Sequence, residues 1–215
     1  MRRKKELLIL GATGDLGSSL VDTFLNKDFN IYILHRKSSD IAKFKNKKSL
    51  KLVHFEKLNL LPDKILKKSF DIVINSAGKY LSDTTESVNR ETFTKTIDDN
   101  FFILLDYFNS VKKSIKKNGI FINISSIASN HGSKVEFSYS SSKLIVDKFL
   151  LEQTLNKKKN FKILNIKPGA FLSKTTSKRK DKKLISTTQL ANTIYKLSSQ
   201  EESIYISSIE IFGSK

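Results

Sequence analysis

Short apolar runs rich in β-branched residues alternate along this chain with longer stretches that have helical periodicity. Strands that are separated by helices pair in parallel, because the helical crossover returns the chain to the same end of the sheet. The apolar runs predict strands over residues 6–10, 30–34, 51–55, 71–75, 119–124, 161–166 and 204–211. Helices are predicted over residues 16–27, 38–47, 88–116, 139–157 and 187–199.

Several of the predicted strands are apolar on both faces, as in Ile120-Phe121-Ile122-Asn123-Ile124. Such runs are typical of strands that helices cover on both sides. We therefore predict an α/β fold of the Rossmann-like, doubly wound type, with three layers and a mostly parallel, seven-stranded sheet. Its 215 residues fit one domain, 1–215, in which residues 173–184 form a flexible substrate loop. Ligands of such folds bind at the carboxyl ends of the strands.

The composition narrows the classes of function. The chain has no cysteine, which excludes disulfides and thiolate metal ligands. Its three histidines, His35, His54 and His131, lack metal-ligand spacing, and no metal site is expected. No apolar run approaches the roughly 20 residues of a membrane span, and the run at 6–10 is too short for a signal-peptide core. We expect a soluble, cytoplasmic protein.

The formal net charge of +18 raises the question of nucleic-acid binding. Lysine accounts for 34 of the 39 basic residues, and the lysines are spread in short runs over the whole chain. Specific readers of nucleic acids rely on arginine forks and aromatic platforms, and no such motif occurs in this sequence. The charge is therefore interpreted as a solvated lysine surface, and no specific nucleic-acid partner is expected.

The first predicted strand ends in a glycine turn, Gly11-Ala12-Thr13-Gly14-Asp15-Leu16-Gly17, and a helical pattern follows directly. Glycines at this junction allow backbone N–H groups to approach a pyrophosphate, and the helix adds the positive end of its dipole. No Gly-Lys-Ser/Thr follows, which excludes a Walker-type loop. The turn predicts a dinucleotide site.

The end of the second predicted strand bears on the choice of dinucleotide. An acidic residue there binds the ribose 2′-hydroxyl of NAD(H), whereas arginine suits the 2′-phosphate of NADP(H). The sequence has Arg36 and Lys37 and no acidic residue at this point. NADP(H) is favoured over NAD(H); the alternative is that Arg36 is only a surface charge.

Tyr139 and Lys143 are four residues apart and share one face of a predicted helix. A lysine ammonium beside a phenol stabilises the phenolate and lowers its pKa, so that tyrosine can exchange protons. In so lysine-rich a chain one such pair is expected by chance. The pair becomes informative only together with the motifs at the ends of the other predicted strands. The ends of other strands carry Ser125-Ser126, Asn75-Ser76-Ala77-Gly78 and Pro168-Gly169, and Asn100 lies in the helix between.

Taken together and in this order, these motifs resemble those of the short-chain dehydrogenase/reductase family over nearly the whole chain. The resemblance implies that Tyr139 is the general acid or base and that Lys143 lowers its pKa. It further implies that Ser126 holds the reacting oxygen and that Asn100 supports a proton relay. It implies the following cofactor-binding residues: Gly11, Thr13, Gly14, Asp15, Leu16, Gly17, Arg36, Lys37, Asn59, Asn75, Ala77, Gly78, Tyr139, Lys143, Pro168, Gly169 and Phe171.

Two positions depart from the common pattern of single-domain members. Asn59 stands where the family usually has Asp, and Asp15 stands where it usually has Gly. The glycine spacing resembles that of the larger, nucleotide-sugar-modifying branch, but the chain has no room for that branch's second domain.

The function expected from the resemblance is that of an NADP(H)-dependent oxidoreductase acting on a carbonyl or alcohol. The alternatives are a nucleotide-sugar epimerase or dehydratase and a non-catalytic NADP(H)-binding sensor or scaffold. The basic segment 174–183 is either solvated charge or a lid that attracts an anionic substrate. By analogy with similar enzymes, a homodimer or homotetramer is expected through the helices that hold Asn100 and Tyr139.

Overall fold

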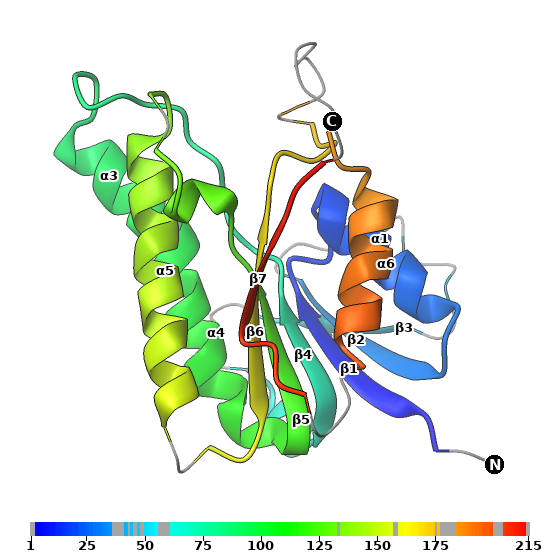
Figure 1. Cartoon of the computed structure of the whole chain (residues 1–215). Helices are drawn as coiled ribbons and strands as arrows, with labels where there is room; N and C mark the ends of the chain where they lie inside the picture. Colours follow the sequence, from blue (N-terminus) through cyan, green and yellow to red (C-terminus); the bar gives the residue numbers. More distant parts are fainter. Residues whose placement is uncertain are drawn as a thin grey trace.

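The computed structural model describes residues 3–35, 41–42, 44, 47, 50–55, 61–132, 134–156, 159–174, 176, 184–199 and 204–213. Its strands form one parallel sheet in the order β3-β2-β1-β4-β5-β6-β7, so the predicted doubly wound topology is confirmed (Figure 1). The strands are β1 (Lys5–Leu10), β2 (Phe29–His35), β3 (Leu50–His54), β4 (Phe70–Asn75), β5 (Ile115–Ile124), β6 (Lys162–Pro168) and β7 (Ser208–Ile211).

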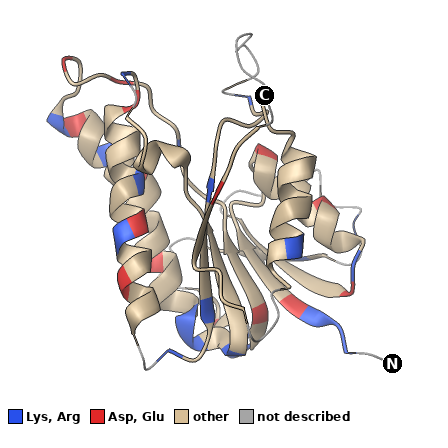
Figure 2. Cartoon of the chain, viewed as in Figure 1, with Lys and Arg blue, Asp and Glu red and all other residues tan. Residues whose placement is uncertain are grey.

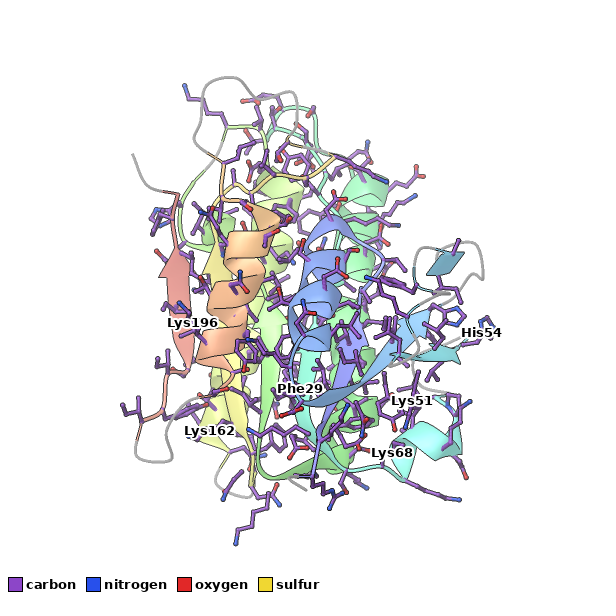
Figure 3. All side chains as sticks on the ribbon, turned by 90° about the vertical axis from the view of Figure 1, so that its right-hand side faces the viewer. Phe29, Lys51, His54, Lys68, Lys162 and Lys196 are labelled. Atoms are coloured by element: carbon purple, nitrogen blue, oxygen red, sulfur yellow. The ribbon has the colours of Figure 1, made fainter. Side chains whose placement is uncertain are left out.

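Helices cover both faces of this sheet, which makes the predicted three layers. They are α1 (Asp15–Leu25), α2 (Asp63–Leu66), α3 (Arg90–Ile97), α4 (Ile103–Val111), α5 (Phe137–Leu155) and α6 (Thr187–Leu197). Helices α1 and α6 lie side by side on one face, as Figure 3 shows, whereas α3, α4 and α5 lie on the other (Figure 1).

The alternation of side chains along each strand explains why the strand sequences are apolar throughout. In β1, Leu7 and Ile9 belong to the core under α1 and α6, whereas Leu8 and Leu10 belong to the core under α4 and α5. All four side chains are buried. A strand between two helical layers has no solvent-facing side, so a polar residue in it must find a partner inside the protein.

The prediction of one long helix over 88–116 is wrong in its length, because several shorter elements occupy this range. The chain forms α3, a π-helical turn η3 (Asp98–Phe102), α4 and a 3₁₀ turn η4 (Lys112–Ser114), and β5 begins at Ile115. Ile115 is buried and pairs with Phe70. Asn118 has a φ of 62°, and the register between β4 and β5 shifts at this end. Because the backbone is irregular here, hydrophobic periodicity alone does not show where β5 begins.

Other boundaries also differ from the prediction. The last strand forms over 208–211 rather than 204–211, and the one-turn helix α2 was not predicted. Of the helix predicted over 38–47, only residues 41, 42, 44 and 47 are among the described ones, and of the loop 173–184 only 173, 174, 176 and 184. Both remain predictions.

Charged residues are spread over the described surface. Figure 2 shows basic residues on helices of both layers and at the amino-terminal end of the sheet, with acidic residues among them. In Figure 3, Lys162 and Lys196 lie on one side of the view and Lys51 and Lys68 on the other. The ammonium groups of Lys51 and Lys68 each lie 5.0 Å from the centroid of the Tyr32 ring. Among the described residues, none of the helices combines the length and apolar character that crossing a membrane requires.

Candidate active site

A cleft of about 590 Å³ opens at the carboxyl ends of the central strands. This is the edge at which ligands of doubly wound sheets bind. The predicted site residues that line the cleft are Gly14, Asp15, Leu16, Gly17, Ala77, Gly78, Ser126, Tyr139, Lys143, Pro168, Gly169 and Phe171. Most of the predicted set thus meets in one place, although it comes from distant parts of the sequence.

The glycine turn between β1 and α1 forms one wall of the cleft. Gly11 has a φ of 82°, and a Cβ atom there would lie 2.5 Å from the backbone nitrogen of Ala77. Gly14 donates its N–H to the Gly11 carbonyl at 3.1 Å, and Thr13 lies in the same turn. Helix α1 starts next to Gly14, and no side chain caps its N-terminus. This open cradle with a positive helix end fits the pyrophosphate of a dinucleotide.

Asp15, the residue that departs from the family pattern, is turned toward the segment after β6. Its Oδ2 accepts a hydrogen bond from the backbone N–H of Lys174 at 2.8 Å. In the same segment Phe171 pairs with Ile185 in an isolated parallel bridge. Asp15 therefore links the glycine turn to the chain that follows Pro168-Gly169.

The turn after β4 brings three predicted residues together. Gly78 has a φ of 154°, and a Cβ atom there would lie 2.7 Å from Asn100 Oδ1 and 3.2 Å from Lys143 Nζ. A side chain at this position would therefore collide with two candidate catalytic residues. Asn75, in contrast, is buried below the cleft, where its Oδ1 accepts the N–H of Ala77 at 3.2 Å. Asn75 therefore shapes the turn and is not part of the cleft lining.

Asn100 lies in the π-helical turn η3 and is buried beneath the cleft. Its Nδ2 donates to the carbonyls of Lys79 and Thr96, both at 3.0 Å. Its Oδ1 accepts the N–H of Lys79 at 3.2 Å. Widened turns of this kind are frequent at functional sites, because they re-aim a side chain without ending the helix. Here the turn connects Asn100 to the segment that follows Gly78.

Ser126, Tyr139 and Lys143 meet where β5 ends and α5 begins. Tyr139 and Ser126 both line the cleft, and Ser126 acts to lower the pKa of the Tyr139 phenol. The Ser126 hydroxyl accepts the N–H of Ala128 at 3.1 Å. Lys143 follows one helical turn after Tyr139, and its Nζ lies 5.6 Å from the centroid of the tyrosine ring. Lys143 is only 5% exposed.

The electrostatic setting of the pair differs from the prediction. Burial raises the pKa of Tyr139 to about 12, and the nearby Glu136 and Tyr80 act in the same direction, against the hydrogen bond from Ser126. Burial also lowers the pKa of Lys143 to about 8, while the charge of Asp147 raises it. The prediction of a lowered tyrosine pKa is therefore wrong for this structure, because desolvation of the phenol outweighs its favourable contacts. Near neutral pH, Tyr139 is a phenol and Lys143 an ammonium.

The start of α5 is held by the segment after β4. Asp83 accepts the backbone N–H of Ser138 at 2.9 Å and also the Ser138 hydroxyl. A bridge pairs Asp83 with Glu136 just before the helix. A carboxylate at a helix N-terminus satisfies free N–H groups and matches the helix dipole. The position of Tyr139 in the first turn is thereby fixed.

The sequence did not identify several other residues that line the cleft. They include Tyr80, His131, Glu136 and Phe212. The ring of Tyr80 packs edge-on against Tyr139, with 5.2 Å between centroids. Only the proximity of Tyr80 to Gly78 in the sequence could have drawn attention to it.

Three predicted cofactor residues, Arg36, Lys37 and Asn59, lie outside the described residues. The neighbouring strand ends are described: His35 on β2 and His54 on β3 are register partners, with ring centroids 5.5 Å apart. Within the described ranges, no group of three acidic or histidine side chains is placed to hold a metal ion.

Two known proteins are similar to this chain in sequence. An uncharacterized oxidoreductase of Staphylococcus saprophyticus is 29% identical over 182 residues, which is 77% of each chain. An uncharacterized oxidoreductase of Schizosaccharomyces pombe is 29% identical over 80% of this chain and 62% of its own length.

Solved structures share the fold. The structure of ElxO with NADP bound superposes with a TM-score of 0.82 at 23% identity, covering 98% of both chains. That of BdcA in complex with NADPH has a TM-score of 0.81 at 16% identity, covering 97% of this chain and 93% of its own. A family model described as short chain dehydrogenase matches residues 5–184. Since that match spans most of the sequence, the chain belongs to the short-chain dehydrogenase family.

Proposed function

We propose that this chain is an NADP(H)-dependent oxidoreductase that transfers a hydride between nicotinamide and a carbonyl or alcohol substrate, with Tyr139 as the general acid or base. The observation that carries the proposal is that Ser126, Tyr139 and Lys143 all line the cleft, with Ser126 acting on the phenol and Lys143 Nζ 5.6 Å from the centroid of its ring. A hydroxyl pair beside a buried ammonium suits a reaction in which an oxygen atom gains or loses a proton.

Each of the three residues has its own role in the direction of reduction. The Ser126 hydroxyl orients the carbonyl oxygen, and the phenol of Tyr139 donates its proton to that oxygen. A pKa of about 12 keeps this proton in place until the oxygen becomes basic. The ammonium of Lys143 then stabilises the phenolate that forms, since the attraction between opposite charges is strong in a desolvated site.

A nicotinamide cofactor supplies the hydride. The cradle of Gly14–Gly17 would hold its pyrophosphate, while Ala77, Gly78, Pro168, Gly169 and Phe171 would border the rest of the dinucleotide. The NADP form is supported by Arg36 and Lys37 in the sequence and by similar structures that contain NADPH or NADP.

The test is turnover of Tyr139→Phe in NADPH oxidation with a panel of aldehydes and ketones. We expect a loss of at least about 100-fold, the usual contribution of a general acid, with NADPH affinity nearly unchanged. Tyr195→Phe is the matched control, because its ring packs between Phe24 and Phe29 outside the cleft. Turnover that survives in Tyr139→Phe on an accepted substrate contradicts the assignment.

The same experiment separates the alternatives. A nucleotide-sugar epimerase or dehydratase would reduce its cofactor transiently, without net consumption of NADPH. A sensor or scaffold would bind NADPH tightly and oxidise none of it with any carbonyl. Such a protein does not need Ser126, Tyr139 and Lys143 in contact, which favours the enzyme.

The proposal extends to a homodimer or homotetramer. Helix α5 buries one side against the sheet, yet Leu144, Leu151 and Leu155 on it are 54%, 52% and 67% exposed. Their spacing of seven and four residues places them on one stripe. Phe102, in η3 directly before α4, is 46% exposed. Helix α4 belongs to the same helical layer as α5 (Figure 1). A second copy of this layer would cover the stripe.

A further inference from the structure

Asp147 is a buried carboxylate on α5, one helical turn after Lys143, and the proposed mechanism does not use it. Its Oδ1 accepts hydrogen bonds from the Ser125 hydroxyl at 2.6 Å and from Asn165 Nδ2 at 2.7 Å. Its Oδ2 forms an ion pair with Lys167 Nζ at 2.9 Å. The side chains of Asp147 and Lys167 are 10% and 11% exposed. The carboxylate therefore joins α5 to the ends of β5 and β6.

Three asparagines form a hydrogen-bonded row that leads to this carboxylate. Asn75, Asn123 and Asn165 are register partners on β4, β5 and β6. Asn75 Nδ2 donates to Asn123 Oδ1 at 2.8 Å, and Asn123 Nδ2 donates to Asn165 Oδ1 at 2.9 Å. All three side chains are buried. The row begins at Ala77, in the turn after β4, and ends at Asp147 on α5, the helix that also carries Tyr139 and Lys143.

The groups at the two ends of the row determine the direction, from donor to acceptor, in which its hydrogen bonds run. The N–H of Ala77 can only donate, so Asn75 must present its oxygen there. An ionised carboxylate can only accept, so Asn165 must present its nitrogen to Asp147. Both ends require the same orientation of the three asparagine amides. In each of the four hydrogen bonds of the row, the donor therefore lies on the side of Ala77 and the acceptor on the side of Asp147. Hydrogen bonds aligned in one sense polarise one another, and here they stabilise a negative charge on Asp147.

Two lysines border that charge. Lys143 precedes Asp147 by one turn on the same helix face, and Lys167 pairs with it directly. Glu210 on β7 adds a negative charge beyond Lys167 and is bound to Asn130 and His131. Toward the start of α5 lie Tyr139 and Glu136, and Asp99 of the neighbouring η3 is paired with Lys79. The carboxylate of Asp147 is thus paired with Lys167 and acts on Lys143, one turn earlier on the helix, through its charge.

We propose that Asp147 is a positioning residue of the oxidoreductase site: its buried charge keeps Lys143 an ammonium, and Lys167 moderates that charge. The catalytic role of Asp147 in this inference rests on the proposed function. Its effect on the charge of Lys143 does not depend on that function. The direction of the shifts in Lys143 agrees with it, since burial lowers the lysine pKa and the charge of Asp147 raises it. Without Asp147, desolvation acts on Lys143 without this opposing charge.

The test measures the pKa of Lys143 directly, by NMR titration of protein labelled at the lysine Cε carbons. The signal that is missing from Lys143→Met identifies the residue. In Asp147→Asn we expect the pKa of Lys143 to fall by about one unit, whereas in Lys167→Gln we expect it to rise by several tenths of a unit. Both variants break the same ion pair. If Asp147 only holds the structure together, both variants should shift the pKa of Lys143 in the same direction. If Asp147 acts through its charge, the two variants should shift that pKa in opposite directions.

Glu152→Gln is the matched control, because it removes one negative charge from the exposed side of α5 and should leave the pKa of Lys143 unchanged. If Asp147→Asn does not fold, the double variant Asp147→Asn/Lys167→Gln removes both charges of the ion pair and should still lower the pKa. An unchanged pKa in folded Asp147→Asn or in the double variant, or a downward shift in Lys167→Gln, overturns the proposal. Because the titration needs no substrate, a failure of the proposed function would leave its result intact.

Discussion

The carboxylate of Asp15 binds the backbone N–H of Lys174 at 2.8 Å, although 159 residues separate the two in sequence. The first residue of α1 thereby holds the segment that follows β6. Four residues further along α1, Ser19 donates its hydroxyl to Thr187 at 2.8 Å, at the start of α6. Helix α1 thus contacts the first residue of the basic segment 174–183 and the start of the helix that follows it.

Removing the Asp15 carboxylate should loosen the chain at Lys174. In Asp15→Ala we expect amide hydrogen exchange at Lys174 to become about fivefold faster, corresponding to a partly exposed hydrogen bond of about 1 kcal/mol. Asp22→Ala, which removes a carboxylate from the exposed side of the same helix, should leave that exchange unchanged. Equal exchange in wild type and Asp15→Ala would show that other contacts hold the segment.

The charge of Lys143 should set the alkaline limit of carbonyl reduction. Lys143 is protonated below its pKa of about 8, and only the ammonium stabilises the phenolate of Tyr139. We therefore expect kcat/KM for reduction to fall as the pH rises through about 8, which steady-state kinetics at saturating cofactor will measure. The residual activity of Lys143→Arg should lack this decline, because arginine stays charged. A wild-type profile that shows no decline in the alkaline range would contradict this role.

The cofactor preference should depend on Arg36. Binding of NADPH and NADH is to be compared by titration calorimetry in wild type and Arg36→Asp. We expect the variant to lose at least about tenfold in NADPH affinity, or about 1.4 kcal/mol, with little change for NADH, because a 2′-phosphate loses its charged partner. Arg90→Asp makes the same charge change on α3, away from the cleft residues. A wild type that prefers NADH would refute the inference from the second strand.

The exposed leucines of α5 should hold the oligomer together. We expect wild type to be a dimer or tetramer by light scattering and Leu151→Lys to shift it toward the monomer, since a buried ammonium would have no partner. Leu66→Lys, at an exposed leucine of α2, is the control. If Leu151→Lys leaves the mass unchanged, the interface lies elsewhere.

Much of the fold could be predicted because its signals are local. Apolar runs such as Ile120–Ile124 are typical of strands buried on both faces, and a glycine turn after such a strand indicates that a helix begins directly behind it. The errors arose where long-range pairing overrides local pattern. Ile115 joined the sheet because it pairs with Phe70, and no periodicity around Lys116 and Lys117 shows this.

The candidate site shows the same division. Ser126, Tyr139 and Lys143 could be placed from their spacing and from the rule that parallel strands end at one edge. The resemblance implies that Asn75 contacts the cofactor, and the structure shows it buried below the cleft, in a row with Asn123 and Asn165. That row depends on three strands aligned to the residue, which sequence spacing does not reveal.

By itself, the sequence determined the doubly wound parallel sheet, the glycine turn and the chemical groups gathered at one edge, because these follow from periodicity and chain order. Only the tertiary structure decided how charge is balanced there. The contact of Asp15 with Lys174 and the pairing of Asp147 with Lys167 join residues from different elements. Likewise, the pKa values of Tyr139 and Lys143 reflect burial more than their spacing of four residues. Desolvation and pairing depend on distances in space, and a sequence fixes those only after the whole chain has packed.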